Sequence, residues 1–521
     1  MAHSDGTGRA PSYAVGSWLL LRLLGLIYLI ACVSLWVQLH GLIGFDGILP
    51  VADYLDLIRD HTGPDRYWRV PTLLWIADGD TALHILCAAG SLLALALTAG
   101  LAPRTVLFLL WACYLSLAQA GQVFLGFQWD TLLLETSFCA LFIAPRGWRP
   151  VRLRHATPPP ACGRWLLWLL LFKLLVLSGA VKPLSFDETW LQLTALEYHY
   201  WTQPLPNGLA WYAHGLPSPM HQLSIVVTYA VEIVLPFGIF VARWGPRWLA
   251  AGTFFLMSAI AWTGNFGFFN LLAVALCLLL IDDALWRRLR FLPTPAAGGP
   301  AAPTGRPARW RGWFAAVCVA SLIGASALTA VRELAFTVPP DAGGIVGTAA
   351  TKIRGLLPQV ADPLLRAIQP YRTINGYGLF RSMTQARPEI VIEGSRDGRN
   401  WKEYAFRWKP GDPARRPPFV APHMPRLDWQ MWFAALDPPR ALPWLTGLLR
   451  GLLRGTPRIV ALLASDPFHG EPPRYVRLLR YDYRFATPAE RRQRGVWWVR
   501  EPTGALTRPL TLADIEARRP R

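Results

Sequence analysis

Long blocks of apolar residues recur through the first two thirds of the chain, and they restrict its fold more than any other feature. A helix that crosses a bilayer needs about 20 mostly apolar residues. By that criterion the sequence predicts about nine spanning helices. They lie near residues 17–40, 81–101, 104–120, 126–144, 163–181, 221–242, 246–263, 266–282 and 312–335. The pattern indicates an integral, multi-pass membrane protein built on a polytopic α-helical bundle.

The composition supports this class and argues against nucleic-acid binding. Hydrophobic residues make up 53% of the chain and charged residues only 16%, whereas soluble domains carry about 25% charged residues. The formal net charge is +19. However, the positive residues lie in loops beside apolar blocks and across the last third, and no nucleic-acid-binding motif accompanies them. We therefore expect membrane lipid as a partner and no nucleic acid.

Cysteine and histidine positions argue against a redox or metal centre. All cysteines lie at or before Cys318, all but Cys162 lie inside apolar blocks, and no CxxC motif occurs. His199, His214 and His221 lack the spacing of a zinc site. We expect no metal and no cofactor.

The charges of the loops predict the orientation of the chain. The loop before residue 81 is acidic, whereas the loops at 146–154 and 284–311 are rich in arginine. Cytoplasmic loops carry an excess of Lys and Arg, and the expected spans place every basic loop on one side of the membrane. We therefore expect a cytoplasmic N-terminus and an extracytoplasmic C-terminal domain.

A change of composition and periodicity divides the chain into parts. The expected parts are a transmembrane helical bundle at 1–290, a Pro/Gly/Ala linker at 291–310, the last transmembrane helix at 311–335 and a β-rich extracytoplasmic domain at 340–521.

Alternating side chains in the last part predict β-strands. Residues 388–412 alternate around Asp397-Gly398, which indicates a β-hairpin. The stretches 473–485 and 495–501 are typical of further strands, and 440–463 of a helical segment. We expect a small, sandwich-like domain with one or two helices.

One expected span, at 126–144, contains an unusual number of polar residues. Gln128, Thr131 and Glu135 share one helix face, because they are spaced i, i+3 and i+7. Asp130 points elsewhere and is expected near the interface, close to water. The expected polar cluster of the membrane comprises Gln128, Asp130, Thr131, Glu135, Lys173 and Glu232.

Lys173 and Glu232 lie halfway along two other expected spans. A lone charge at the bilayer midplane costs ~3 kcal/mol or more, so such groups usually pair, face a cavity or perform chemistry. We expect Lys173 to pair with Glu135, Glu232 or both. A static ion pair that fixes helix packing and a polar cavity that serves a ligand or proton transfer are the two interpretations.

The extracytoplasmic domain supplies candidates for binding a protein client. A chaperone-like surface needs exposed aromatic groups, but alternating strands bury half of such residues. His423, Arg426 and Asp428 invite a catalytic role, although without a nucleophile elbow a hydrogen-bonded loop anchor is the ordinary one. Arg387 is expected to form an ion pair where a strand begins. The candidate client-binding residues are Arg387, Trp401, Trp408, His423, Arg426, Asp428, Trp429 and Trp432.

Long motifs, in order along nearly the whole chain, resemble the lipase maturation factor family. They are FQWDTLLLET at 127–136, LTALEYHYWTQPLPNGLAWYAH at 193–214, RPEIVIEGSRDGRNWKEYAFRWKPGD at 387–412 and PHMPRLDWQMWFAAL at 422–436. The resemblance implies a polytopic membrane protein with a cytosolic N-terminus and a lumenal C-terminal domain. It also implies a chaperone-like, non-enzymatic role, in which exported clients such as homodimeric lipases reach their active, assembled form.

The resemblance leaves two locations open. Animal members of the family reside in the endoplasmic reticulum. This chain ends IEARRPR, without an ER-retrieval tetrapeptide, and has no N-x-S/T sequon. Its usage of Ala, Arg, Pro and Trp indicates a GC-rich, bacterial genome. We expect the inner membrane for a bacterial protein and the endoplasmic reticulum membrane for a eukaryotic one. No sequence feature indicates an oligomeric state.

A weaker likeness supports an enzymatic alternative. SGAVKPLSFDETW at 178–190 is similar to a segment of the vitamin K-dependent carboxylase group and related horizontally transferred transmembrane domains, in which a lysine at this place is catalytic. Lys182 matches that lysine, although Pro183 departs from the pattern. The alternative is a membrane enzyme acting on a lipid or quinone-coupled substrate, with Lys182 as base. It predicts a lipid-sized cavity that touches Lys182, His199 and His214.

Overall fold

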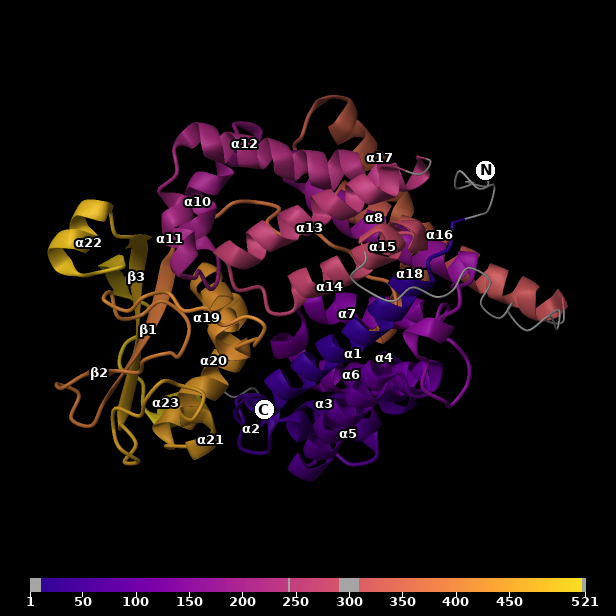
Figure 1. Ribbon diagram of the computed structural model, residues 1–521. Coiled ribbons are helices and arrows are strands. Elements are labelled where there is room, and N and C mark those ends of the chain that lie inside the picture. Colours follow the sequence, from indigo (N-terminus) through magenta and orange to yellow (C-terminus); the bar gives the residue numbers. More distant parts are fainter. Residues whose placement is uncertain (1–10, 242–243, 290–308, 518–521) are drawn as a thin grey trace.

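The computed structural model describes residues 11–241, 244–289 and 309–517. Figure 1 shows a large helical bundle, which contains the N-terminal part of the chain, beside a smaller domain that contains the sheet. The expected linker at 291–310 lies outside the described residues, except for its end, where helix α16 (Arg309–Thr337) begins.

The helices that can cross a membrane match five of the expected spans. The structure has 5 helical stretches that are long and apolar enough, or 6 if the bent pair Phe269–Leu280 and Asp283–Leu289 counts as one. The expectation of about nine spans is therefore not confirmed among the described residues, whereas a multi-pass helical region is. The 5 stretches are α1 (Ala14–Trp36), α5 (Asp80–Ala99), α8 (Ala161–Leu184), Ser218–Phe240, which begins as α12 (Ser218–Tyr229), and Ala316–Thr337 within α16.

The other expected spans form helices that are too short or too polar. α7 (Gln128–Ala140) has 13 residues and α14 (Phe269–Cys277) has 9. At about 1.5 Å per residue, α7 is shorter than the ~30 Å hydrocarbon core. α6 (Pro103–Ala120) and α13 (Gly245–Thr263) have 18 and 19 residues, but an arginine in the first turn of each lowers its mean hydropathy. Counting apolar blocks therefore gives more spans than the length and hydropathy of the described helices support.

Shorter helices connect these elements. They are α2 (Leu39–Ile43), α3 (Val51–Thr62), α4 (Arg66–Arg69), α9 (Glu188–Leu191), α10 (Ala195–Thr202), α11 (Gly208–His214), α15 (Asp283–Leu289), α17 (Gly344–Val360) and α18 (Asp362–Ile368).

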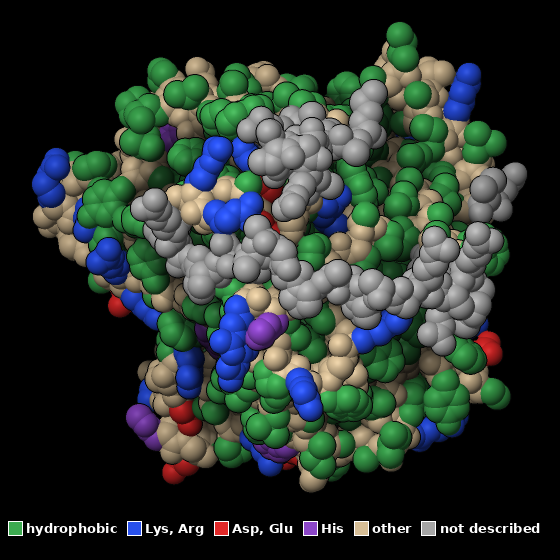
Figure 2. Space-filling view, turned by 45° about the vertical axis from the view of Figure 1, so that its right-hand side comes forward, with side chains coloured by type: hydrophobic (Ala, Val, Ile, Leu, Met, Phe, Trp, Pro, Cys, Tyr) green, Lys and Arg blue, Asp and Glu red, His purple; other side chains and the backbone are tan. Residues whose placement is uncertain are grey.

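The bundle has an apolar interior and an apolar exterior. Leu20, Leu24 and Ile27 of α1 are fully buried, and the core around them continues into the C-terminal domain. On the outside, Leu92 of α5 and Leu223 of α12 are 67% and 62% exposed. Figure 2 shows hydrophobic side chains over wide areas of the visible surface, with few acidic ones. Exposed leucines of this kind suit contact with lipid.

The C-terminal domain contains one antiparallel sheet, with the strand order β2-β1-β3-β4. The strands are β1 (Pro388–Ser395), β2 (Lys402–Glu403), β3 (Tyr475–Phe485) and β4 (Trp498–Ala505). The expected hairpin around Asp397-Gly398 is confirmed by the pairing of β1 with β2. Gly398 has φ +72°, and Asp397 accepts hydrogen bonds from the N–H groups of Arg399 and Asn400, both at 2.8 Å. An Asp-Gly pair provides this turn because Gly adopts positive φ without strain.

The expected sandwich is wrong for the described residues, which hold this single sheet. Helix α19 packs on β1, helix α20 contacts β3, and α19 also contacts the bundle. Helices therefore cover the face that a second sheet would cover, and they lie between sheet and bundle (Figure 1). The domain also has more than the one or two helices expected. They are α19 (Arg426–Leu436), α20 (Pro438–Leu453), α21 (Pro457–Val460), α22 (Pro488–Arg494) and α23 (Leu512–Glu516).

Candidate functional site at the junction of bundle and C-terminal domain

Glu135, on α7, is the centre of the polar cluster inside the bundle. One carboxylate oxygen, Oε1, accepts a hydrogen bond from Lys173 on α8, in a buried ion pair. The other, Oε2, accepts hydrogen bonds from the backbone N–H of Asn375 at 2.9 Å and from the hydroxyl of Tyr377 at 2.7 Å. Burial, and then the charge of Glu135, raise the pKa of Tyr377, so its hydroxyl keeps the proton that it donates. The carboxylate thus joins two bundle helices to the segment that leads to the sheet.

Gln128 and Thr131 lie on the same face of α7 and meet the same segment. The side-chain amide of Asn375 donates to the Thr131 carbonyl at 3.3 Å, and the backbone N–H of Gly378 donates to Gln128 Oε1 at 3.4 Å. The sequence reasoning missed Asn375 and Tyr377 because they lie in a loop, outside any apolar or alternating pattern.

Glu232 does not share this cluster but pairs with Lys182. The two charged groups are 2.6 Å apart and buried, and Lys182 also donates to the carbonyl of Ser178 at 2.6 Å. Glu232 lies in a π-helical stretch, Ala230–Val234, that interrupts the fourth candidate span. π-bulges of this kind often place a side chain at a functional position.

A small cavity lies beside the pair of Lys182 and Glu232. It has a volume of ≈ 100 Å³, and His199 and Asn270 also line it. His214 does not belong to its lining. Since an engineered cavity of about 150 Å³ holds benzene, this space is too small for the lipid that the enzymatic alternative requires, and one of the three expected residues is absent from it.

The burial of His199 predicts a stability that depends on pH. Burial, and then the charge of Lys182, lower the pKa of His199 to about 4, whereas a histidine in an unfolded chain has a pKa of about 6.5. Between pH about 6.5 and 4, His199 therefore binds a proton in the unfolded state but not in the folded state. We expect the free energy of unfolding to decrease as the pH falls from about 6.5 towards 4.

Thermal unfolding in detergent at a series of pH values checks this expectation. The variant His199→Gln should lose part of the decrease, while His61→Gln, which alters an exposed histidine, should retain it. An unchanged pH profile in His199→Gln contradicts the assignment.

Asp130 is buried, contrary to the expectation that it lies near water. Its side chain is 0% exposed and forms a two-pronged ion pair with Arg426 of α19, in which Oδ1 accepts from Nη2 at 2.8 Å. The hydroxyl of Tyr114 on α6 also donates to Oδ1, at 2.6 Å. Burial opposes the charge of Arg426, but Asp130 raises the pKa of the guanidinium above its usual value. This pair links the bundle to the C-terminal domain.

His423, Arg426 and Asp428 point towards different partners. His423 Nδ1 is 2.9 Å from the hydroxyl of Ser34 on α1. Asp428 Oδ1 accepts from the backbone N–H groups of Trp408 and Lys409, both at 2.9 Å. The three side chains therefore anchor loops and helices, as the ordinary interpretation expects.

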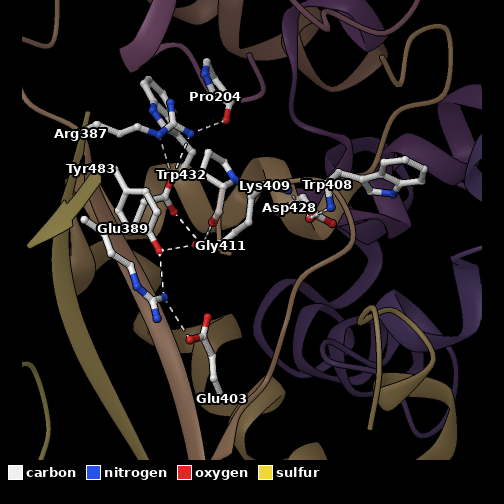
Figure 3. A network of polar contacts seen from close by, with 12 residues as sticks. Pro204, Arg387, Glu389, Glu403, Trp408, Lys409, Gly411, Asp428, Trp432 and Tyr483 are labelled. Carbon is white, nitrogen blue, oxygen red and sulfur yellow. Dashed lines mark hydrogen bonds and ion pairs between the residues drawn. The ribbon is translucent and has the colours of Figure 1, made fainter. Parts of the chain in front are cut away.

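Figure 3 shows a network of polar contacts around Arg387 and Glu389 of the sheet. Arg387 is 1% exposed. It donates to Glu389 at 3.0 Å and to the carbonyls of Trp201 and Pro204, both at 2.8 Å. Lys409 donates to the other oxygen of Glu389 at 2.7 Å. Arg387 thus holds the sheet to the segment at 195–214, which is rich in aromatic residues and which we call the aromatic segment. It also forms the ion pair expected where β1 begins.

The remaining client-binding candidates differ in exposure. Trp429 is buried, with its ring centroid 4.8 Å from that of Trp129 on α7. Trp401, Trp408 and Trp432 are partly exposed. The ring of Trp401 lies 4.1 Å from the guanidinium of Arg477, and Trp432 donates to the carbonyl of Thr202 at 2.8 Å. Only the partly exposed residues have surface to offer a partner.

Cysteine and metal chemistry have little support in the described residues. Within them, no group of three or more His, Cys, Asp or Glu could hold a metal ion. The cysteines are free thiols, and Cys162 is the exposed one.

Comparisons with known proteins agree with this architecture. The family model described as the lipase maturation factor transmembrane domain matches residues 15–288, and the model of the lipase maturation factor C-terminal domain matches residues 373–508. Lipase maturation factor 2 of Homo sapiens is 36% identical over 94% of this chain and 81% of its own length. Lipase maturation factor 1 of Bos taurus is 31% identical over 97% of this chain and 91% of its own length. No solved structure matches.

These matches cover the bundle and the sheet-containing domain together, in the order that the four motifs have along the chain. They give no support to the carboxylase-like alternative for Lys182. The chain belongs to the lipase maturation factor family.

Proposed function

We propose that the chain is a membrane-anchored maturation factor, which assists the folding or assembly of exported, lipase-like proteins. The observation that carries this proposal is the match of both family domains, together with relatives named lipase maturation factors over most of their length. The buried contacts of Arg426 and Glu135 add a physical reason, because they fix the C-terminal domain to the bundle in one arrangement. A client bound by the domain is then held at a defined place beside the membrane.

The proposed orientation has a cytoplasmic N-terminus and an extracytoplasmic C-terminal domain. Helices α6 and α7 follow each other as a pair, and so do α13 and α14. Counting both members of a pair as spans, or neither of them, leaves the later loops on the same side. With the 5 candidate spans, the arginine-rich loops at 146–154 and 284–311 still share one side, which positive charge marks as cytoplasmic. The proposed location is the inner membrane in a bacterium or the endoplasmic reticulum membrane in a eukaryote.

The proposed client-binding surface consists of residues of the C-terminal domain with two different tasks. Trp401, Trp408, His423 and Trp432 are partly exposed and contact the client. The buried residues Arg387, Arg426, Asp428 and Trp429 hold this surface in position through the contacts described above. Aromatic side chains suit this task because they bury a large apolar area at low entropic cost.

Co-production with a secreted homodimeric lipase, in cells that lack their own maturation factor, tests the proposal. We expect the full-length chain to raise the specific activity of the lipase and its dimeric fraction. The variant Trp401→Ala should weaken client binding, and loss of an aromatic hot-spot residue costs about 2 kcal/mol, or about 30-fold in affinity.

Trp68→Ala is the matched control, because Trp68 is also exposed but lies on the short helix α4, before α5. It should leave lipase maturation unchanged. A lipase that reaches full activity without the chain, or that gains nothing from it, contradicts the proposal.

A further inference from the structure

An apolar cavity lies between two candidate spans, α8 and α16. Its volume is ≈ 330 Å³, more than twice that of the engineered cavity of about 150 Å³ that holds benzene. Ala327 and Val331 of α16 line it and are exposed, so the cavity reaches the outer, lipid-facing surface of the bundle. Its apolar walls include Leu166, Leu170, Leu177, Leu322, Ile323 and Leu334.

The inner end of the cavity carries charged groups. Lys173 and Glu135 both line it, although they are only 6% and 2% exposed. Glu135 uses Oε1 for Lys173 and Oε2 for Asn375 and Tyr377. The carboxylate therefore holds the ammonium group of Lys173 in a fixed position at the end of an apolar space.

The ammonium group of Lys173 has hydrogen-bonding capacity left. It has three N–H donors. Within the described residues, one donates to Glu135, and the ammonium nitrogen lies 5.4 Å from the centroid of the Tyr377 ring. A ligand in the cavity can therefore accept a hydrogen bond from Lys173, and such a bond is strong because its donor is charged and buried.

We propose that this cavity binds one acyl chain of a membrane glycerolipid, whose ester carbonyl accepts a hydrogen bond from Lys173. The chain lies between α8 and α16, where leucine and isoleucine side chains replace the neighbouring lipid tails. This lipid site is independent of the proposed client-binding surface.

The charges favour a neutral ester over an acid. Lys173 and Glu135 together have no net charge, so a carboxylate or phosphate bound there would be an uncompensated buried anion, which is costly in a low dielectric. An ester carbonyl offers the same acceptor oxygen without that cost. A free fatty acid is the other source of an acyl chain, and it must either stay protonated or displace Glu135.

Photo-crosslinking of the full-length protein in membranes tests this site. The probes are a monoacylglycerol and a free fatty acid with the same photoactivatable, alkyne-tagged chain. We expect the monoacylglycerol to label peptides that contain 166–177 and 322–334, several-fold more strongly than the fatty acid does. The readout needs no lipase client, so its failure is distinguishable from failure of the proposed function.

Two cavity-filling variants and one control locate the site. Ala330→Phe and Ser326→Leu add side-chain volume inside the cavity and should each reduce labelling several-fold. Ser321→Leu makes the same change as Ser326→Leu at an exposed position of α16 that does not line the cavity, and it should not reduce labelling. Variants are compared only if they elute as a single species and unfold at the temperature of the parent protein.

Three results overturn the proposal. Equal labelling of the parent protein, Ala330→Phe, Ser326→Leu and Ser321→Leu excludes the cavity as the site. Equal or stronger labelling by the free fatty acid excludes the ester as the group that Lys173 recognises. The double variant Lys173→Met/Glu135→Gln removes both buried charges together, so the stronger labelling by the monoacylglycerol should disappear in it. Persistence of that preference also overturns the proposal.

Discussion

Replacing Arg426 with methionine is expected to lower the free energy of unfolding by about 3–5 kcal/mol, the usual cost of removing one partner of a buried ion pair. The apolar stem of the side chain is kept, so the loss comes from the charge. Among the described residues, the buried side chain of Asp130 would keep only the hydroxyl of Tyr114 as a hydrogen-bond partner, and the carbonyl of Phe124 would lose a hydrogen bond of 3.0 Å. An uncompensated carboxylate at 0% exposure is the dominant cost.

Chemical unfolding in detergent measures this difference, and the junction itself offers a matched control. Arg458 also links the C-terminal domain to the bundle, through Asp80, but its side chain is 46% exposed. Arg458→Met should therefore cost only about 0–1 kcal/mol. Adding Asp130→Asn to Arg426→Met removes the stranded charge and should recover part of the loss. Equally small losses in Arg426→Met and Arg458→Met contradict the assigned role of the buried pair.

Local patterns allowed much of the C-terminal domain to be predicted from the sequence. The alternation in 388–412 and the Asp397-Gly398 turn predicted the hairpin of β1 and β2, because strand period and turn chemistry act between near neighbours in the chain. The sandwich was wrong for a related reason. Alternation indicates that one face of a sheet is covered, but it does not say whether a second sheet or helices such as α19 and α20 cover it.

The sequence predicted the pair of Lys173 with Glu135, which the structure confirms, but it did not predict the partners of Glu232 and Asp130. The free-energy cost of a lone charge inside the bilayer identified Glu135, Lys173 and Glu232 as residues that need partners. The spacing within α7 gave no information about residues far along the chain, and Asp130 pairs with Arg426, which is 296 positions away. The position of Asp130 near the end of its helix predicted contact with water. This prediction was wrong, because the C-terminal domain excludes water from that end of the bundle.

The count of about nine spans is not confirmed, because hydropathy measures composition and not the length of a helix. The apolar block at 126–144 suffices for a span by composition, but α7 ends at Ala140 after 13 residues. Its polar residues bind the segment around Asn375 and helix α19, so this helix is packed inside protein, where a helix need not reach across the bilayer.

Arg387→Leu is the second variant with a large expected effect, again about 3–5 kcal/mol in the free energy of unfolding. Arg387 satisfies the carbonyls of Trp201, Gln203 and Pro204, which no longer have this donor in the variant. Glu389 would keep only Lys409, so one of its two buried oxygens loses its cation. Burial lowers the pKa of Arg387, and the charge of Glu389 opposes this effect.

The effect should appear in the segment around residues 195–214 as well as in global stability, because Arg387 is where the sheet holds that segment. Hydrogen exchange of the full-length protein should show faster exchange in α10 and α11 of Arg387→Leu. Arg477→Leu is the matched control on the same strand pair, since Arg477 also pairs with a glutamate of β1, Glu393, but is 30% exposed. It should cost at most about 1 kcal/mol and leave exchange in α10 unchanged. If Arg387→Leu slowed lipase maturation without faster hydrogen exchange in α10 and α11, Arg387 would act on the client directly. If lipase maturation and hydrogen exchange changed together, the task of Arg387 is to position the aromatic segment against the sheet.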